Sequence, residues 1–181
     1  MKRTVRPICA AICTALAIVL PLTLHTIPNA GKIFLPMHIP VLLCGAICGP
    51  YYGLACGVLA PMLSYIVSGM PTAVILPGMM CELAAYGAVF GAMASAMRRI
   101  PDPAGSYISL VTAMLCGRAA SGITNALIFQ RGTYTVKTWL TASFATAIPG
   151  IVIQLVAIPT VLAILRNAGV IDPSPVSRKQ D

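Results

Sequence analysis

The chain has 181 residues, of which 58% are hydrophobic and only 9% are charged, and its mean hydropathy is +0.89. Because soluble domains carry roughly 25% charged residues, this composition excludes a soluble globular protein and makes lipid the expected solvent. The net charge of +8 does not indicate nucleic-acid binding, because the basic residues stand at the ends of apolar runs and form no single patch.

The apolar runs predict an all-α integral membrane protein. Crossing the hydrocarbon layer takes about 20 helical residues, and runs that are continuous, without alternation, exclude a β-barrel. We therefore expect one domain over residues 1–171, a compact bundle of about six transmembrane helices. The expected spans are 8–24, 36–48, 51–68, 74–97, 106–129 and 141–166.

Both ends of the chain need separate interpretation. Basic residues precede the first apolar run, as in a secretory signal, but the run exceeds the ~7 to 15 residues typical of one and no small-residue cleavage site follows. We expect a retained first helix.

The second span is short, and we expect it to tilt or to begin below the outer surface. Residues 172–181 contain two prolines and mixed charges, and we expect a disordered tail.

The distribution of Lys and Arg predicts the orientation. With an even number of spans, eight basic residues fall on one side and three on the other. Cytoplasmic loops carry the excess of positive charge, so both termini are predicted to be cytoplasmic. The larger set is Lys2, Arg3, Arg6, Arg98, Arg99, Arg166, Arg178 and Lys179, and the smaller set is Lys32, Arg131 and Lys137.

Small residues recur at helical spacing and predict close helix packing. Glycines at 45, 49, 53 and 57 indicate that the second and third spans form a tight antiparallel pair, and Gly87 and Gly91 repeat the spacing in the fourth span. Ala11 and Ala15 repeat it in the first span. This last pair favours either internal packing or docking against another membrane protein.

The seven cysteines all lie within apolar stretches. Neither a disulfide framework nor a zinc site is indicated, because the two pairs at i,i+4 spacing lack the CxxC pattern and a second cluster. We expect these residues to pack as small apolar side chains, and we expect no metal.

After the charges at the span ends are assigned, Glu82 and Arg118 are the two charged residues that remain inside the expected spans. A charge there indicates a functional site unless it is paired. Two interpretations compete, a structural ion pair between the fourth and fifth helices and the polar floor of an outward-facing binding pocket. The second is favoured because further polar residues share the level of these two, namely Tyr86, Ser121, Asn125 and Gln154.

Two predicted outer loops add further candidates for substrate binding. Asn29, Lys32 and His38 fall in the first loop and the start of the second helix, and Arg131 and Trp139 fall in the fifth loop. One interpretation is that the two loops close over a bound solute. The other is interfacial anchoring, which is common for aromatic residues at this depth.

Enzyme signatures are absent from the sequence. It contains no GxxxxGK[ST] loop for ATP, no HExxH and no GxSxG, and no span contains the residues of an intramembrane protease. We expect no enzyme activity and no cofactor.

Several runs resemble the substrate-specific S component of energy-coupling factor (ECF) vitamin transporters. They are KIFLPMHIPVLLCG from Lys32 to Gly45, CGPYYGL from Cys48, CELAAYG from Cys81 and LCGR from Leu115. The resemblance covers nearly the whole chain. It implies a multi-pass protein of the bacterial cytoplasmic membrane that binds a micronutrient at the outer side. It also implies a shared transmembrane coupling protein and two cytosolic ATPases as partners, with Ala11 and Ala15 matching the family's AxxxA docking motif.

The ligand stays open at this point. Branches of the family carry pantothenate, queuosine precursors and other small water-soluble vitamins. A free Glu82 would suit a cationic amine and a free Arg118 a carboxylate, but if the two residues bind each other neither inference holds. The alternatives to an S component are a stand-alone channel or facilitator for small solutes and a membrane-embedded enzyme.

Overall fold

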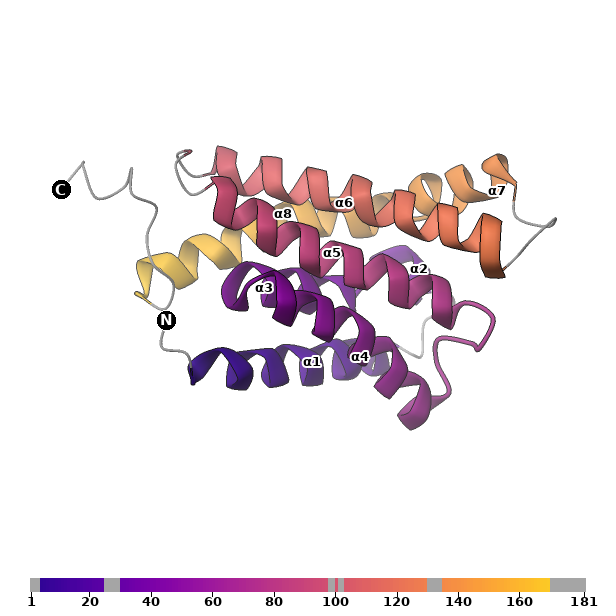
Figure 1. Ribbon diagram of the computed structural model, residues 1–181, viewed down its shortest axis with the longest axis horizontal. Coiled ribbons are helices and arrows are strands. Elements are labelled where there is room, and N and C mark those ends of the chain that lie inside the picture. The colour runs from indigo at the N-terminus through magenta and orange to yellow at the C-terminus, as the bar shows by residue number, and fades with distance from the viewer. Residues whose placement is uncertain (1–3, 25–29, 98–99, 101–102, 130–134, 170–181) are drawn as a thin grey trace.

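A computed structural model of the chain describes residues 4–24, 30–97, 100, 103–129 and 135–169, and the described segments form helices and turns. Most of the helices run roughly along the long axis of an elongated bundle (Figure 1). In chain order the elements are α1 (Val5–Thr23), α2 (Ala30–Phe34), α3 (His38–Cys48), α4 (Pro50–Ser68), α5 (Leu76–Ala96), α6 (Ala104–Thr124), the π-helical turn η2 (Asn125–Phe129), α7 (Val136–Leu140), the π-helical turn η3 (Thr141–Ala145) and α8 (Ile148–Asn167).

The all-α membrane fold class predicted from the sequence is confirmed. Helices α1, α4, α5 and α8 are long and apolar enough to cross a membrane. Of the other two predicted spans, α3 is apolar but has only 11 residues. α6 has 21 residues, and Arg118 and its serines lower its hydropathy. By length and composition, therefore, four of the six predicted spans qualify.

Two predicted connections contain helices that the sequence analysis missed. The short helices α2 and α7 lie in the first and fifth predicted loops. The last predicted span, 141–166, is divided into η3 and α8. Pro149 stands in the first turn of α8, where proline fits a helix start but cannot continue a helix from the preceding turn. As a result, η3 follows α7 directly and is separate from α8.

Glycines hold three helices together in the middle of the bundle. Gly49 alone joins α3 to α4 and adopts φ +102°, which lets the chain reverse so that Gly45 and Gly53 meet across the turn. A Cβ at either position would overlap the backbone of Gly87 on α5. The expected pairing of α3 with α4 is confirmed, and α5 is a third partner that the spacing did not identify.

Two apolar clusters flank this contact. One joins α1, α3, α4 and α5 and contains the buried Cys13, Cys44, Cys48 and Cys56. The other joins α3, α5, α6 and α8 around Tyr86 and includes Leu42, Phe90, Leu110 and Ile158. All seven cysteines are free, and within the described ranges no group of three or more His, Cys, Asp or Glu side chains could hold a metal ion. The four buried cysteines thus pack as small side chains in the apolar core.

Helix α1 runs along the α3–α4 side of the bundle (Figure 1) and buries only Cys13 and Ala17 fully. Ala11 and Ala15 are exposed, as are larger neighbours such as Ile12, which is 55% exposed. Internal packing against the described residues therefore does not explain the spacing of the two alanines.

Candidate binding site

Glu82 of α5 is the centre of a group of polar side chains in the interior of the bundle. Its Oε1 atom lies 3.5 Å from Nε of Arg118 on α6 and 3.7 Å from Nε2 of His38 on α3. Arg118 and His38 are buried, and the Glu82 side chain is 14% exposed. A single charge in such surroundings costs several kcal/mol. The burial of Glu82 and Arg118 therefore depends on their contact with each other.

Tyr86 ties this group to the apolar core. It lies one helical turn after Glu82 and is fully buried. Nε of Arg118 donates a hydrogen bond of 3.0 Å to Oη of Tyr86, and the His38 ring meets the Tyr86 ring edge-on with 5.1 Å between centroids. The tyrosine ring occupies the place that a side chain at Gly117 would take. Tyr86 therefore orients both a cation and an imidazole.

Ser121 and Asn125 extend the polar surface of α6 beyond Arg118. Both are buried, and Nδ2 of Asn125 donates a hydrogen bond of 3.4 Å to Oγ of Ser121. The Asn125 carboxamide lies against Gly78, where a Cβ would overlap it. Because Gly78 is four residues before Glu82, the polar surface of α6 stays in contact with α5 over about two helical turns.

Gln154 brings α8 to the same region. It is fully buried and shares one helix face with Gly150 and Ile158, four residues away on either side. A Cβ at Gly150 would lie 3.0 Å from the side chain of Leu35, and Ile158 belongs to the same apolar cluster as Leu42. His38 lies between Leu35 and Leu42 in the sequence. The neighbours of Gln154 on this helix face thus lie against the part of the chain that carries His38.

Unsatisfied hydrogen-bonding atoms distinguish this group, which we call the polar cluster: His38, Glu82, Tyr86, Arg118, Ser121, Asn125 and Gln154. In the part of the chain that the structure describes, every buried side-chain nitrogen or oxygen atom without a hydrogen-bond partner belongs to five of these residues. The atoms are Nδ1 and Nε2 of His38, Oε1 of Glu82, Nη2 of Arg118, Oδ1 of Asn125, and Oε1 and Nε2 of Gln154. Each such atom costs about 1 to 3 kcal/mol when it is left unpaired. Within the described residues, these atoms are thus concentrated in one region of the bundle.

Trp139 connects α7 to the polar cluster. Its Nε1 atom donates a hydrogen bond of 3.0 Å to the carbonyl oxygen of Arg118. A Cβ at Gly122 would lie 2.6 Å from the same nitrogen. The position of the indole therefore requires a residue without a side chain at 122. Phe144 of η3 meets the indole edge-on at 5.7 Å between ring centroids. These contacts place a short helix across the end of α6.

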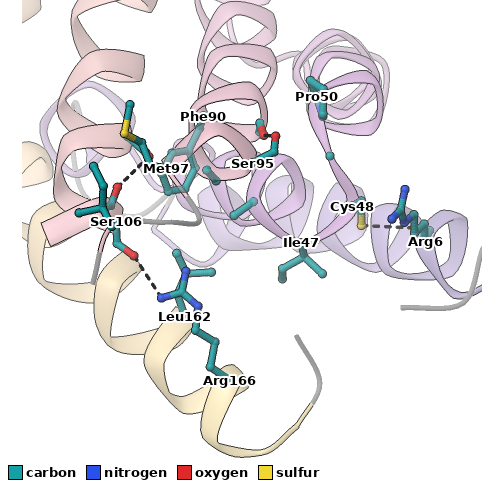
Figure 2. A pocket seen from close by; sticks show the side chains of 17 residues that line it. Arg6, Ile47, Cys48, Pro50, Phe90, Ser95, Met97, Ser106, Leu162 and Arg166 are labelled. Atoms are coloured by element: carbon teal, nitrogen blue, oxygen red, sulfur yellow. Dashed lines mark hydrogen bonds between the residues drawn. The ribbon is translucent and has the colours of Figure 1, made fainter. Parts of the chain in front are cut away.

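Two cavities lie elsewhere in the molecule. One of about 210 Å³ lies where α1 begins and α8 ends (Figure 2), and Arg6 and Arg166 are among its lining residues. Nη1 of Arg166 donates a hydrogen bond of 3.3 Å to Ser106 there. The other, of about 390 Å³, is an apolar groove beside Trp139. Neither is lined by Glu82 or Arg118.

The structure brings together seven of the predicted substrate-binding residues and leaves others apart. His38 was expected in a group with Asn29 and Lys32, but it belongs to the polar cluster. Asn29 and Arg131 lie outside the described residues, and the Lys32 side chain lies outside them too although its backbone is part of α2. The sequence analysis did not single out Gly78, Gly117 and Gly122. Gly117 and Gly122 adjoin Arg118 and Ser121 in the sequence, and Gly78 is one helical turn before Glu82. These positions were the signal that could have found them.

Comparisons with known proteins agree with this architecture. Residues 6–162 match the family model described as ECF transporter, substrate-specific component. Comparisons with curated proteins and with solved structures found no significant match. The family match spans most of the chain and includes every member of the polar cluster. The chain therefore belongs to the substrate-specific components of ECF transporters, which are multi-pass proteins of the cytoplasmic membrane.

Proposed function

We propose that the chain binds a vitamin or vitamin-like micronutrient at the polar cluster and delivers it inward with a coupling protein and two cytosolic ATPases. The observation that carries this proposal is the concentration of unpartnered buried polar atoms on α3, α5, α6, α8 and η2. Membership in the family supports the general role. A bound ligand would satisfy atoms that are otherwise costly to bury.

The geometry favours a binding site over a purely structural ion pair. Oε1 of Glu82 lies 3.5 and 3.7 Å from its two partners, and these distances exceed those of strong charge-assisted hydrogen bonds, about 2.7 to 2.9 Å. A pair that served only to lock two helices would not need unpartnered groups on Gln154 and Asn125. Because these contacts are long, Glu82 and Arg118 can also bind polar groups of a third molecule.

Access from the outer side involves the segments around α2 and α7. Trp139 of α7 donates a hydrogen bond to the Arg118 carbonyl, and we propose that displacement of α7 gives the solute a route to the cluster. Asn29, Lys32 and Arg131 belong to the same two outer segments in our proposal and contact the solute as it enters. Our proposal places both termini in the cytoplasm, as the distribution of Lys and Arg predicts, so these segments face outward.

Delivery needs a surface for the coupling protein. The exposed Ala11 and Ala15 on α1 provide small residues that allow close approach of another helix. In our proposal the coupling protein docks on this face.

The test is ligand retention by purified protein. Arg118→Ala removes a charge-paired group of the polar cluster, and we expect loss of the small molecule that copurifies with the gently solubilised wild-type chain, measured by mass spectrometry. Arg6→Ala is the matched control, because Arg6 is exposed and lies at the opposite cavity. Retention equal to wild type in Arg118→Ala would reject the polar cluster as the binding site.

A further inference from the structure

The charges of Glu82 and Arg118 balance each other. Nε of Arg118 lies 3.5 Å from Oε1 of Glu82, and the two side chains carry opposite charges. Four further members of the cluster, Tyr86, Ser121, Asn125 and Gln154, have neutral side chains. The pair at the centre of the cluster therefore has no net charge to offer a ligand.

A ligand with a net charge would disturb this balance. The cluster lies among membrane helices, where an uncompensated charge is strongly disfavoured. A carboxylate would compete with Glu82 for Arg118, and an ammonium would compete with Arg118 for Glu82. In either case one charge would lose its partner. A ligand without net charge leaves the pair intact.

The unpartnered atoms also specify hydrogen-bonding groups. Gln154 presents a donor, Nε2, and an acceptor, Oε1, on one planar carboxamide, and both are unpartnered. This holds for either assignment of the amide oxygen and nitrogen. The complement of such a pair is a neighbouring C=O and N–H, as in a carboxamide, a lactam or a ureido group. Nη2 of Arg118 and Oδ1 of Asn125 add a further donor and acceptor.

We infer that the substrate of this chain is a molecule without net charge that bears a carboxamide, lactam or ureido group paired with Gln154. The inference rests on the proposed function, since it assumes that the polar cluster is the binding site. It selects among micronutrients by chemistry, because it excludes simple carboxylates and free amines as the preferred class.

The test uses matched compounds that differ in charge on one scaffold. Nicotinamide is compared with nicotinate, and a deazaguanine carrying a nitrile with one carrying an aminomethyl group. Binding to the purified chain in detergent is measured by equilibrium dialysis and thermal shift, and any copurified molecule is identified by mass spectrometry. We expect the neutral compound of at least one pair to bind roughly tenfold or more tightly than its charged counterpart, or the copurified molecule to be neutral with one of the three groups.

Two variants separate the contributions of charge and hydrogen bonding. Gln154→Leu keeps the volume and removes both polar atoms, so the neutral ligand should lose affinity by about tenfold or more. Thr160→Val is its control, because Thr160 is an exposed residue of the same helix whose hydroxyl bonds only to the Val156 carbonyl in the described structure. Glu82→Gln leaves Arg118 unbalanced, so preference should move toward the carboxylate of a pair. This shift would be visible even if Gln154→Leu failed to fold.

The outcomes distinguish this inference from the proposed function. If the compound that binds wild type most tightly is a charged one, or the copurified molecule is charged, the inference is wrong although the binding function stands. Equal affinity of Gln154→Leu and wild type for a neutral ligand also overturns it. If the wild-type chain retains no small molecule and binds none of the compounds, the proposed binding function fails and the inference fails with it.

Discussion

Tyr86 shows how a single neutral side chain organises the charged residues around it. Its ring fills the space left by Gly117 and meets His38 edge-on, while its hydroxyl accepts the hydrogen bond from Arg118. Without that hydroxyl, Nε of Arg118 would lose its hydrogen-bond partner. At this scale, the orientation of the guanidinium depends on one atom of a residue that carries no charge.

Tyr86→Phe removes that atom and keeps the ring in place. Loss of a hydrogen bond to a charged group costs about 1.5 to 3 kcal/mol, and we expect ligand affinity to fall by roughly tenfold or more while the helical fold is kept. Equilibrium dialysis and circular dichroism provide the two measurements. Tyr51→Phe is the control, because Tyr51 is 87% exposed. Unchanged affinity in Tyr86→Phe would mean that Arg118 is oriented by other contacts.

At the scale of elements, the approach of α5 to α3 and α4 sets the position of Glu82. Gly87 is five residues after Glu82, and a Cβ at Gly87 would overlap the backbone of Gly53 on α4. The same helix contacts Gly45 on α3, seven residues after His38. The distance between His38 and Glu82 therefore depends on how closely three backbones approach.

Gly87→Ala tests this dependence. Its Cβ would lie 2.9 Å from Cα of Gly53 and closer still to the neighbouring carbonyl, which are backbone atoms that cannot rotate away. Overpacking of this kind costs about 1 to 3 kcal/mol, so we expect the thermal midpoint in detergent to fall by several degrees. Gly31→Ala is the matched control, since a Cβ at Gly31 meets nothing within 4 Å. Equal midpoints for the two variants would show that the helices can separate without loss of stability.

At the scale of the whole molecule, α1 is the least buried of the helices that can cross a membrane. It is held by Cys13, Ala17 and a few polar contacts, such as the 3.3 Å hydrogen bond from Thr14 to Cys56. Large apolar side chains such as Ile8, Ile12 and Val19 are exposed on its remaining surface. A helix with one packed side and one open side suits a component that binds its partner laterally in the membrane.

Ala11→Leu should separate ligand binding from assembly. The larger side chain prevents close helix approach, so we expect the affinity for the coupling protein to fall by roughly tenfold or more, with ligand binding unchanged. Copurification with the coupling protein and equilibrium dialysis measure the two properties. Ala163→Leu makes the same change at an exposed position on α8 and should leave both properties intact. Normal assembly of Ala11→Leu would exclude this face as the docking surface.

The sequence by itself determined the class of fold and the residues of interest. Continuous apolar runs leave helices as the solution in lipid, and Glu82 and Arg118 stand out because hydrocarbon excludes unpaired charge. Their place next to Tyr86, Ser121 and Asn125 follows from helical spacing. Their role in binding a substrate stays a prediction.

Only the tertiary structure decided which helix faces meet. Periodicity fixes neighbours within a helix but not the rotation of one helix against another, so the contact of His38 with Glu82 and the meeting of Gly87 with both Gly45 and Gly53 could not be read from the sequence. The same holds for α7, since a five-residue helix is too short to be stable alone. Its position depends on the bond from Trp139 to Arg118, which joins residues 21 positions apart.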